Sequence, residues 1–244
     1  MPFKVYCQNL ENENDRKKTA DLMVYHGLAD CFVNRLSSFY DNLSDYEQSR
    51  ADRFKHEADY CCYVTVHALL RIQLSKILGK KAKSISLGES EHGKPFIPGV
   101  DLPFSISRTR NLFAFVVGHG NQFLGVDIEQ IKPEIDYTAI SRNYFSDKEQ
   151  ELILSLKNPE DQKHTFFEIW TRKEALLKAI GIGINAELHK VQVLEGGNLL
   201  EIEGAPVDAH TFKIATTRRK ETLISVASST DFVPEFKNLS FVLS

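Results

Sequence analysis

Two neighbouring segments constrain the fold of this 244-residue chain most strongly. The first is a predicted strand that ends with two acidic residues, and the second is a long predicted helix that carries acidic and basic side chains. The strand covers residues 123–129 and ends in GVDIE, and the helix contains residues 170–181, WTRKEALLKAIG. Side chains alternate across a strand, so Asp127 and Glu129 share one face while Val126 and Ile128 point to the other. Two neighbouring carboxylates repel each other, and a hard cation such as Mg²⁺ or Mn²⁺ would relieve the repulsion. The alternative is an edge strand with a solvated acidic face.

The helix has clear signals at both ends. Asn158 is a favourable N-cap, Pro159 suits the first helical position, and Gly181 is typical of a C-terminal end. Residues spaced four apart place one stripe along the helix: Phe166, Trp170, Glu174 and Lys178. Taken alone, the stripe also fits an ordinary helical ion pair beside a core tryptophan.

Together, these blocks resemble the signature of the 4′-phosphopantetheinyl transferase superfamily, namely GVDIE followed by W-x-x-KEA-x-x-K-x-x-G. The resemblance is to the larger monomeric, surfactin-synthetase-activating type. Three further segments match in the same order: a basic stretch at 44–54, GKP at 93–95 and F-x-x-S at 104–107. The resemblance implies that the chain transfers the phosphopantetheine arm of coenzyme A to a serine of an apo acyl or peptidyl carrier protein. Adenosine 3′,5′-bisphosphate would be released.

The resemblance also implies roles for the acidic residues. Asp127, Glu129 and Glu174 would hold Mg²⁺, with Mn²⁺ as the alternative ion, and the metal would offset charge on the diphosphate. Glu174 is in addition the candidate general base for the carrier serine, although a carboxylate bound to a metal is a weak base. Lys178 would contact the diphosphate and steady the leaving group.

Basic residues of the N-terminal half would hold the nucleotide. Arg50 and Arg53 lie three apart on a helix that begins at the capping box 44–47, and the resemblance implies that they contact the 3′-phosphate of coenzyme A. Without it, they would be a solvated basic face. Lys94 and Pro95, in the GKP turn, would contact the adenine or a phosphate.

Three more residues complete the expected coenzyme A contacts, and one of them departs from the family. Ser107 is the serine of F-x-x-S, and Arg108 follows it where the family usually has histidine. Arginine can bind phosphate but cannot shuttle protons at ordinary pH. Lys173 lies about 100° around the helix from Glu174, so it would meet a different part of the ligand or solvent. A second departure is Cys62, where the family commonly has arginine.

The order of expected elements predicts an α+β fold. Helices are expected at 59–78, 146–156 and 159–181, and strands at 3–8, 85–87, 112–118, 123–129, 191–194, 211–216 and 223–227. The resemblance implies two similar subdomains related by a pseudo-twofold, with the ligand cleft between them. Residues 1–120 would form the nucleotide-binding subdomain and residues 121–244 the subdomain with the metal and catalytic residues.

Composition narrows the alternatives. A net charge of −3 argues against a general nucleic-acid binder. Charges or turns interrupt every apolar stretch before membrane-spanning length, so we expect a cytoplasmic protein, and its size suits the monomeric type. Two other functions stay open: a non-catalytic relative that binds coenzyme A or a carrier protein, and an unrelated Mg²⁺-dependent enzyme acting on phosphate anhydrides.

Overall fold

The computed structural model has the predicted α+β composition and describes residues 20–120, 122–132, 134–183, 188–194, 198–200 and 212–240. The strand predicted at 3–8 lies outside these residues. The helices are α1 (Leu36–Tyr40), α2 (Asp45–Ala51), α3 (Glu57–Leu78), α4 (Tyr137–Tyr144), α5 (Asp147–Ser155) and α6 (Pro159–Ile180), with 3-10 turns at Ala29–Arg35, Ala82–Ser84 and Leu188–Lys190. The strands are β1 (Ala20–Leu28), β2 (Gly88–Glu89), β3 (Pro95–Phe96), β4 (Phe104–Thr109), β5 (Leu112–Val117), β6 (Leu124–Gln130), β7 (Val191–Gln192), β8 (Leu199–Leu200), β9 (Lys213–Arg219), β10 (Thr222–Ser228) and β11 (Phe232–Asn238).

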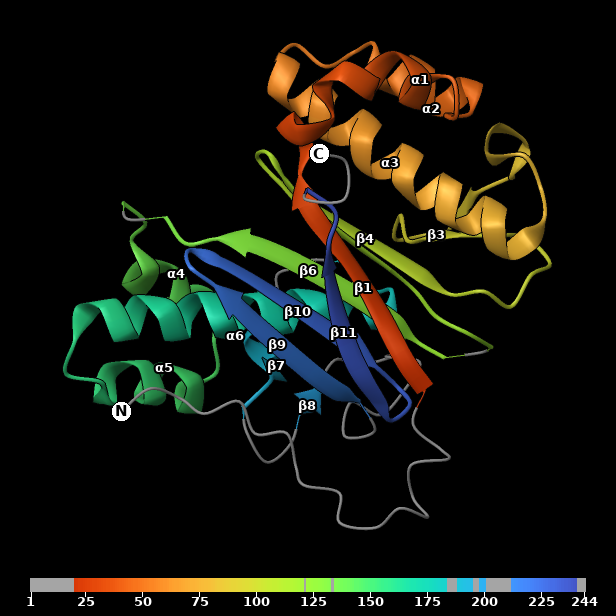
Figure 1. Cartoon of the computed structure of the whole chain (residues 1–244). Helices are drawn as coiled ribbons and strands as arrows, with labels where there is room; N and C mark the ends of the chain where they lie inside the picture. Colours follow the sequence, from red (N-terminus) through yellow and green to blue (C-terminus); the bar gives the residue numbers. More distant parts are fainter. Residues whose placement is uncertain are drawn as a thin grey trace.

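Two larger sheets organise the described part of the chain. One is four-stranded, in the order β11-β1-β5-β4, and the other is three-stranded, in the order β6-β10-β9. All their pairs are antiparallel except β1 with β11, which is parallel. Helix α3 packs on β4 and β5, and α6 packs on β6 and β10, so each sheet has one long helix against it (Figure 1). Two short hairpins, β2-β3 and β7-β8, complete the pairing.

The two sheets meet along β4 and β6. A fully buried apolar cluster fills the junction between them, with members from β1, β5, β6 and β10: Leu22, Val24, Ala114, Val116, Leu124, Val126, Ile128, Ile224 and Val226. Beside this cluster, Ser105 Oγ of β4 accepts a hydrogen bond from the Val126 amide of β6 at 3.1 Å. The junction therefore fixes the polar ends of β4 and β6 next to each other.

The last strand returns to the first sheet. Strand β11 pairs with β1 in register Ala20↔Phe232 through His26↔Asn238, which links the two ends of the described chain. The sequence did not predict either strand. The division at residue 120 and the pseudo-twofold stay predictions, and β11 is a segment from beyond residue 120 that belongs to the sheet of the first half.

The predicted helix ends are confirmed. The Asn158 side chain accepts a hydrogen bond from the Glu160 amide, and α6 ends at Gly181 with φ of 84°. Helix α2 begins with the expected capping box of Ser44 and Glu47. Helix α3 ends at Gly79, with φ of 63°.

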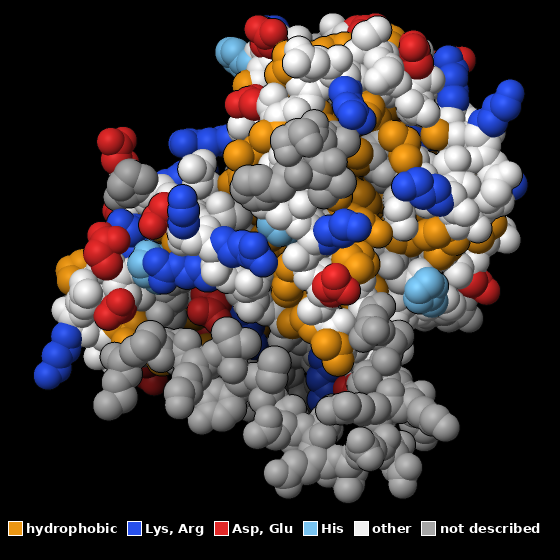
Figure 2. All heavy atoms as spheres, viewed as in Figure 1, with side chains coloured by type: hydrophobic (Ala, Val, Ile, Leu, Met, Phe, Trp, Pro, Cys, Tyr) orange, Lys and Arg blue, Asp and Glu red, His pale blue; other side chains and the backbone are white. Residues whose placement is uncertain are grey.

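The surface shows no strong bias of charge on the face in view. Lys and Arg side chains of the described residues are interspersed with Asp and Glu in Figure 2, as the net charge of −3 suggests. Within the described residues, no helix combines the length and the apolar character that a membrane span requires.

Candidate active site

Strand β6 supplies two acidic side chains on one face. Asp127 is 4% exposed and Glu129 is half-buried, while Val126 and Ile128, on the other face, are fully buried in the core. Strand β4 supports both acids, because Ser107 Oγ donates to Asp127 Oδ1 at 2.8 Å and Thr109 Oγ1 donates to Glu129 Oε2 at 3.2 Å. The predicted alternation of β6 is therefore confirmed, and its acidic face is partly enclosed rather than fully solvated.

Helix α6 approaches this face unusually closely because β6 contains Gly125. A Cβ atom on Gly125 would lie only 2.1 Å from the Ala175 carbonyl oxygen and 2.4 Å from the Ala179 amide nitrogen. The absence of a side chain thus lets the helix backbone rest on the strand. This contact sets Glu174 and Lys178, on the turns beside it, within reach of the acids of β6.

Lys178 shows how close the two elements are. Its Nζ donates to Asp127 Oδ1 at 2.7 Å and to Ser107 Oγ at 2.8 Å. Three elements that are far apart in sequence, β4, β6 and α6, thereby meet in one hydrogen-bonded group. Such a partly buried ammonium balances part of the negative charge that the carboxylates bring.

The carboxylates influence one another strongly. Burial raises the pKa of Glu174 to about 7; the charges of Asp127 and Glu129 add to the rise, and Lys178 opposes it. Burial, followed by the charge of Asp127, also raises the pKa of Glu129. Among the described residues, Asp127 Oδ2 and Glu174 Oε1 are buried and have no hydrogen-bond partner. Unpaired buried carboxylate oxygens are costly, so these two atoms mark a place where a positive ligand would be stabilised.

The donor set suits a hard divalent cation. In the part of the chain that the structure describes, no three His, Cys, Asp or Glu side chains form a ready cage for a metal ion. The Ser107 hydroxyl and the Lys178 ammonium both donate to Asp127 Oδ1, so the other oxygen, Oδ2, is the one without a partner. The unpaired oxygens of Asp127 and Glu174 are nevertheless the ligand type that Mg²⁺ and Mn²⁺ prefer, and Mg²⁺ commonly keeps water and substrate oxygens in its shell. The residues present therefore fit such an ion.

A cavity of 360 Å³ opens beside this acidic group. Its lining comes from α3, β4 and α6: His67, Ile106, Ser107, Arg108 and Lys178. The guanidinium of Arg108 lies over the Phe54 ring at 5.2 Å and over the Tyr63 ring at 5.8 Å, which holds the cation at the cavity wall. The cavity is thus bordered by two cations, with the carboxylates next to Lys178.

The two predicted arginines have different positions, because α2 ends at Ala51 and only Arg50 lies on it; the expectation that both lie on this helix was wrong. Arg50 lies over the Tyr63 ring at 5.9 Å and 3.8 Å from Glu89, so it shares an aromatic neighbour with Arg108. Arg53 is exposed, and its Nε donates to the Ser49 carbonyl at 3.0 Å. The structure thus brings Arg50 toward the cavity wall, and the phosphate contacts of both arginines stay predictions.

The GKP turn meets the end of α6. Lys94 Nζ donates to the Ala179 carbonyl at 2.6 Å, and burial lowers the pKa of Lys94 to about 8. Lys94 and Pro95 line a second cavity, of 260 Å³, and Phe96 and Phe123 also form part of its lining. Lys94 therefore contacts the residue that follows Lys178, while the nucleotide contact expected for Lys94 and Pro95 stays a prediction.

Lys173 corrects one expectation. The residue is only 1% exposed. Its Nζ forms an ion pair with Glu149 at 2.6 Å and donates to the carbonyls of Leu188, at 2.9 Å, and Val191. These contacts bind α6 to α5 and to the segment after α6, away from the acidic group. Lys173 therefore has a structural role, and the coenzyme A contact expected for it was wrong because its side chain is fully engaged elsewhere.

Three residues of the site were missed in the sequence. Ser105 and Thr109 alternate with Ser107 along β4, and all three bond to β6. The Ser-x-Ser-x-Thr pattern was the available signal, since it predicts a polar strand face. His67 lines the cavity, but it lies within a predicted helix and carried no local signal.

Comparisons with known proteins agree with this geometry. Residues 123–226, which contain β6, α6 and most of β10, match the model of the 4′-phosphopantetheinyl transferase superfamily. The chain is 31% identical to the 4′-phosphopantetheinyl transferase HetI of Nostoc sp. over 164 residues, covering 66% of this chain and 68% of that protein. It is 28% identical to the 4′-phosphopantetheinyl transferase Sfp of Bacillus subtilis over 156 residues, covering 64% and 67%. A further Bacillus subtilis 4′-phosphopantetheinyl transferase is 31% identical over 153 residues, covering 62% and 66%.

The chain belongs to the 4′-phosphopantetheinyl transferase superfamily. The resemblance drawn from the sequence motifs is thereby confirmed, including its similarity to the Sfp-like type.

Proposed function

We propose that this protein transfers the 4′-phosphopantetheine arm of coenzyme A to a serine of an apo acyl or peptidyl carrier protein, with a divalent metal, releasing adenosine 3′,5′-bisphosphate. The observation that carries the proposal is the convergence of β6 and α6. Two buried, unpaired carboxylate oxygens of Asp127 and Glu174 lie beside a cavity bordered by the cations Arg108 and Lys178. Such a site suits a diphosphate bound through a metal.

The metal would be held by Asp127, Glu174 and Glu129. Asp127 and Glu174 would contribute their unpaired oxygens, and Glu129, held by Thr109, would complete the acidic face. When bound, Mg²⁺ or Mn²⁺ would neutralise charge on the diphosphate and on the leaving phosphate.

The residues of α6 would handle the proton and the leaving group. The carrier serine Oγ would attack the phosphorus that carries pantetheine, and the bond from this phosphorus to the bridging oxygen would break. Glu174 would accept the serine proton. Burial and the neighbouring acids raise the pKa of its carboxyl to about 7 in the metal-free protein, and a bound cation would lower it. Lys178 would exchange Asp127 for the leaving phosphate, because an ammonium prefers the more negative partner.

The first half of the chain would hold the nucleotide. Ser107 and Arg108 line the cavity directly, and Arg50 shares Tyr63 with Arg108 as an aromatic support. Arg53, in the turn after α2, and Lys94 with Pro95 in the GKP turn would complete the contacts to the phosphate and adenine. Arg108 would bind phosphate without a proton-transfer role, so any acid step must come from another group.

Mass spectrometry of a carrier protein tests this function. Purified protein, coenzyme A, Mg²⁺ and an apo peptidyl carrier protein should yield a carrier heavier by one phosphopantetheine. Asp127→Asn and Glu174→Gln should abolish the gain, whereas Glu151→Gln, an exposed residue of α5, should leave it unchanged. Coenzyme A binding without transfer would indicate a non-catalytic relative, and hydrolysis of the diphosphate without a carrier would indicate a different anhydride enzyme.

A further inference from the structure

The imidazole of His67 forms part of the cavity wall and has no role in the function proposed so far. It lines the cavity together with Arg108 and Lys178, and its side chain keeps an exposure of 21%. The ring packs on Tyr63 with their centroids 4.0 Å apart. His67 is therefore a polar ring held in place at the wall, where a ligand can reach it.

The neighbouring carboxylate decides which ring nitrogen is free. His67 Nδ1 lies 3.3 Å from Glu47 Oε1. Burial alone would raise the pKa of Glu47, but the hydrogen bond and charge of His67, the charge of Arg71 and the Ser44 amide outweigh it and lower the pKa to about 2. An ionised carboxylate can only accept hydrogen bonds, so Nδ1 must carry the proton. Nε2, at the opposite edge of the ring, is left for a ligand.

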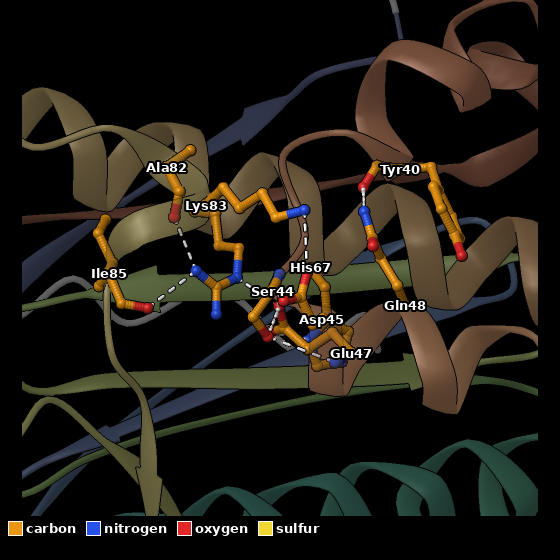
Figure 3. Close-up of polar contacts among 10 residues, drawn as sticks. Tyr40, Ser44, Asp45, Glu47, Gln48, His67, Ala82, Lys83 and Ile85 are labelled. Carbon is orange, nitrogen blue, oxygen red and sulfur yellow. Dashed lines mark hydrogen bonds and ion pairs between the residues drawn. The ribbon is translucent and has the colours of Figure 1, made fainter.

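Glu47 is itself held rigidly. Arg71 Nε donates to Glu47 Oε2 at 2.5 Å, and the same guanidinium donates to the carbonyls of Ala82 at 2.7 Å and Ile85 at 3.0 Å (Figure 3). The Ser44 amide donates to Oε2 at 2.9 Å. Because every one of these groups is fixed, the orientation of the His67 ring is fixed too, as for a histidine with a carboxylate partner in a catalytic site.

The charges around the ring favour a neutral imidazole in the free protein. The charged and titratable groups around it come from four elements: Glu47 and Arg50 from α2, Tyr63 and Arg71 from α3, Arg108 from β4, and Lys178 from α6. Burial lowers the pKa of His67, the Glu47 carboxylate opposes this, and the charges of Arg108 and Arg50 lower it further. A phosphate bound between these cations would add negative charge on the Nε2 side and favour the imidazolium.

We propose that His67 binds the ribose 3′-phosphate of coenzyme A through Nε2 and takes up a proton as that phosphate binds. The inference rests on the proposed function. The diphosphate is assigned to the side of the cavity where Lys178 meets Asp127, whereas His67 comes from α3, on the other sheet. The phosphate within reach of His67 is therefore the one that does not react, so His67 determines whether the enzyme distinguishes coenzyme A from dephospho-coenzyme A.

Calorimetric titration of the full chain with coenzyme A tests the inference. Titrations at one pH, in buffers with different ionisation enthalpies, give both the dissociation constant and the number of protons taken up. The comparison is between the unaltered protein, His67→Gln, and His56→Gln, an exposed histidine at the start of α3 that serves as the matched control. Because the phosphate also titrates, the difference in proton count between the proteins is the measured quantity.

The expected results separate the two ligands. His67→Gln should bind coenzyme A about tenfold to a hundredfold more weakly, as for the loss of a hydrogen bond to a charged group, and should take up about one proton fewer. It should bind dephospho-coenzyme A as tightly as the unaltered protein does, which also shows that it is folded. His56→Gln should match the unaltered protein with both ligands.

Three results would overturn the inference. Equal affinity and proton count for coenzyme A in His67→Gln and the unaltered protein would exclude the contact. Equal weakening for both ligands would exclude the 3′-phosphate as its partner. Failure of the unaltered protein to bind coenzyme A at all would instead refute the proposed function, and this inference with it.

Discussion

Replacing Gly125 with alanine should separate α6 from β6 and disable the site without changing any polar group. The added Cβ would lie 2.1 Å from the Ala175 carbonyl oxygen, and it is also only 2.4 Å from the Ala179 amide nitrogen. Both neighbours are backbone atoms of a helix, so no side chain can rotate away. To restore an ordinary contact of 3.4 Å to the carbonyl oxygen, helix and strand must move apart by about 1.3 Å.

The size of the shift predicts the size of both effects. Overpacking of a tight core costs about 1–3 kcal/mol, and a rigid neighbour places Gly125→Ala at the upper end of that range. A displacement of about 1 Å in a catalytic group lowers the rate by about 100-fold. The same displacement would weaken the 2.7 Å contact of Lys178 with Asp127.

Urea denaturation and the carrier-loading assay measure the two effects. Gly88→Ala is the matched control, because the three atoms nearest to its Cβ would all belong to the ring of Phe96, a side chain rather than backbone, and 46% exposed. The control should lose less than about 1 kcal/mol and keep its activity. A Gly125→Ala protein with unaltered loading would refute the claim that this close approach positions the site.

The buried pair of Glu47 and Arg71 should stabilise the fold far more than an exposed pair. Glu47→Gln leaves the buried guanidinium of Arg71 without its carboxylate partner and should cost about 3–5 kcal/mol in urea denaturation. Glu89→Gln, at an exposed ion pair, should cost less than about 1 kcal/mol. Because folding lowers the pKa of Glu47 to about 2, the stability that its carboxylate contributes is present above pH 4.5 and is lost as the pH falls toward 2. The stabilities of Glu47→Gln and the unaltered protein should therefore converge in acid. A difference that stays constant with pH would contradict this. Lys178→Met should bind Mn²⁺ several-fold more tightly in the absence of coenzyme A, because the change removes a competing cation from Asp127. It should still lower carrier loading about 100-fold. Weaker Mn²⁺ binding would show that Lys178 does not compete with the metal.

Local signals gave the elements that hold the site. The Asn158 cap and Gly181 set both ends of α6, and the alternation in GVDIE set the face of Asp127 and Glu129. These features depend on residues close in sequence, so their physics can be evaluated without a tertiary structure.

Long-range contacts explain what the sequence could not show. Lys173 and Glu174 are neighbours in the chain, but only the packing of α5 against α6 reveals that Glu149 engages Lys173. The strand expected at 85–87 fails for a similar reason: the Arg71 guanidinium binds the Ile85 carbonyl, and strand pairing begins only at Gly88. His67 likewise joins the site only because the two sheets pack together.

The central claim is that acids from β6 and α6 bind a single divalent ion, and a crystal structure with Mn²⁺ and coenzyme A tests it most directly. The anomalous signal of manganese should give one peak within bonding distance of oxygens of Asp127 and Glu174, with Lys178 moved from Asp127 to a phosphate. A peak elsewhere, with Lys178 still bound to Asp127 while coenzyme A fills the cavity, would contradict the account.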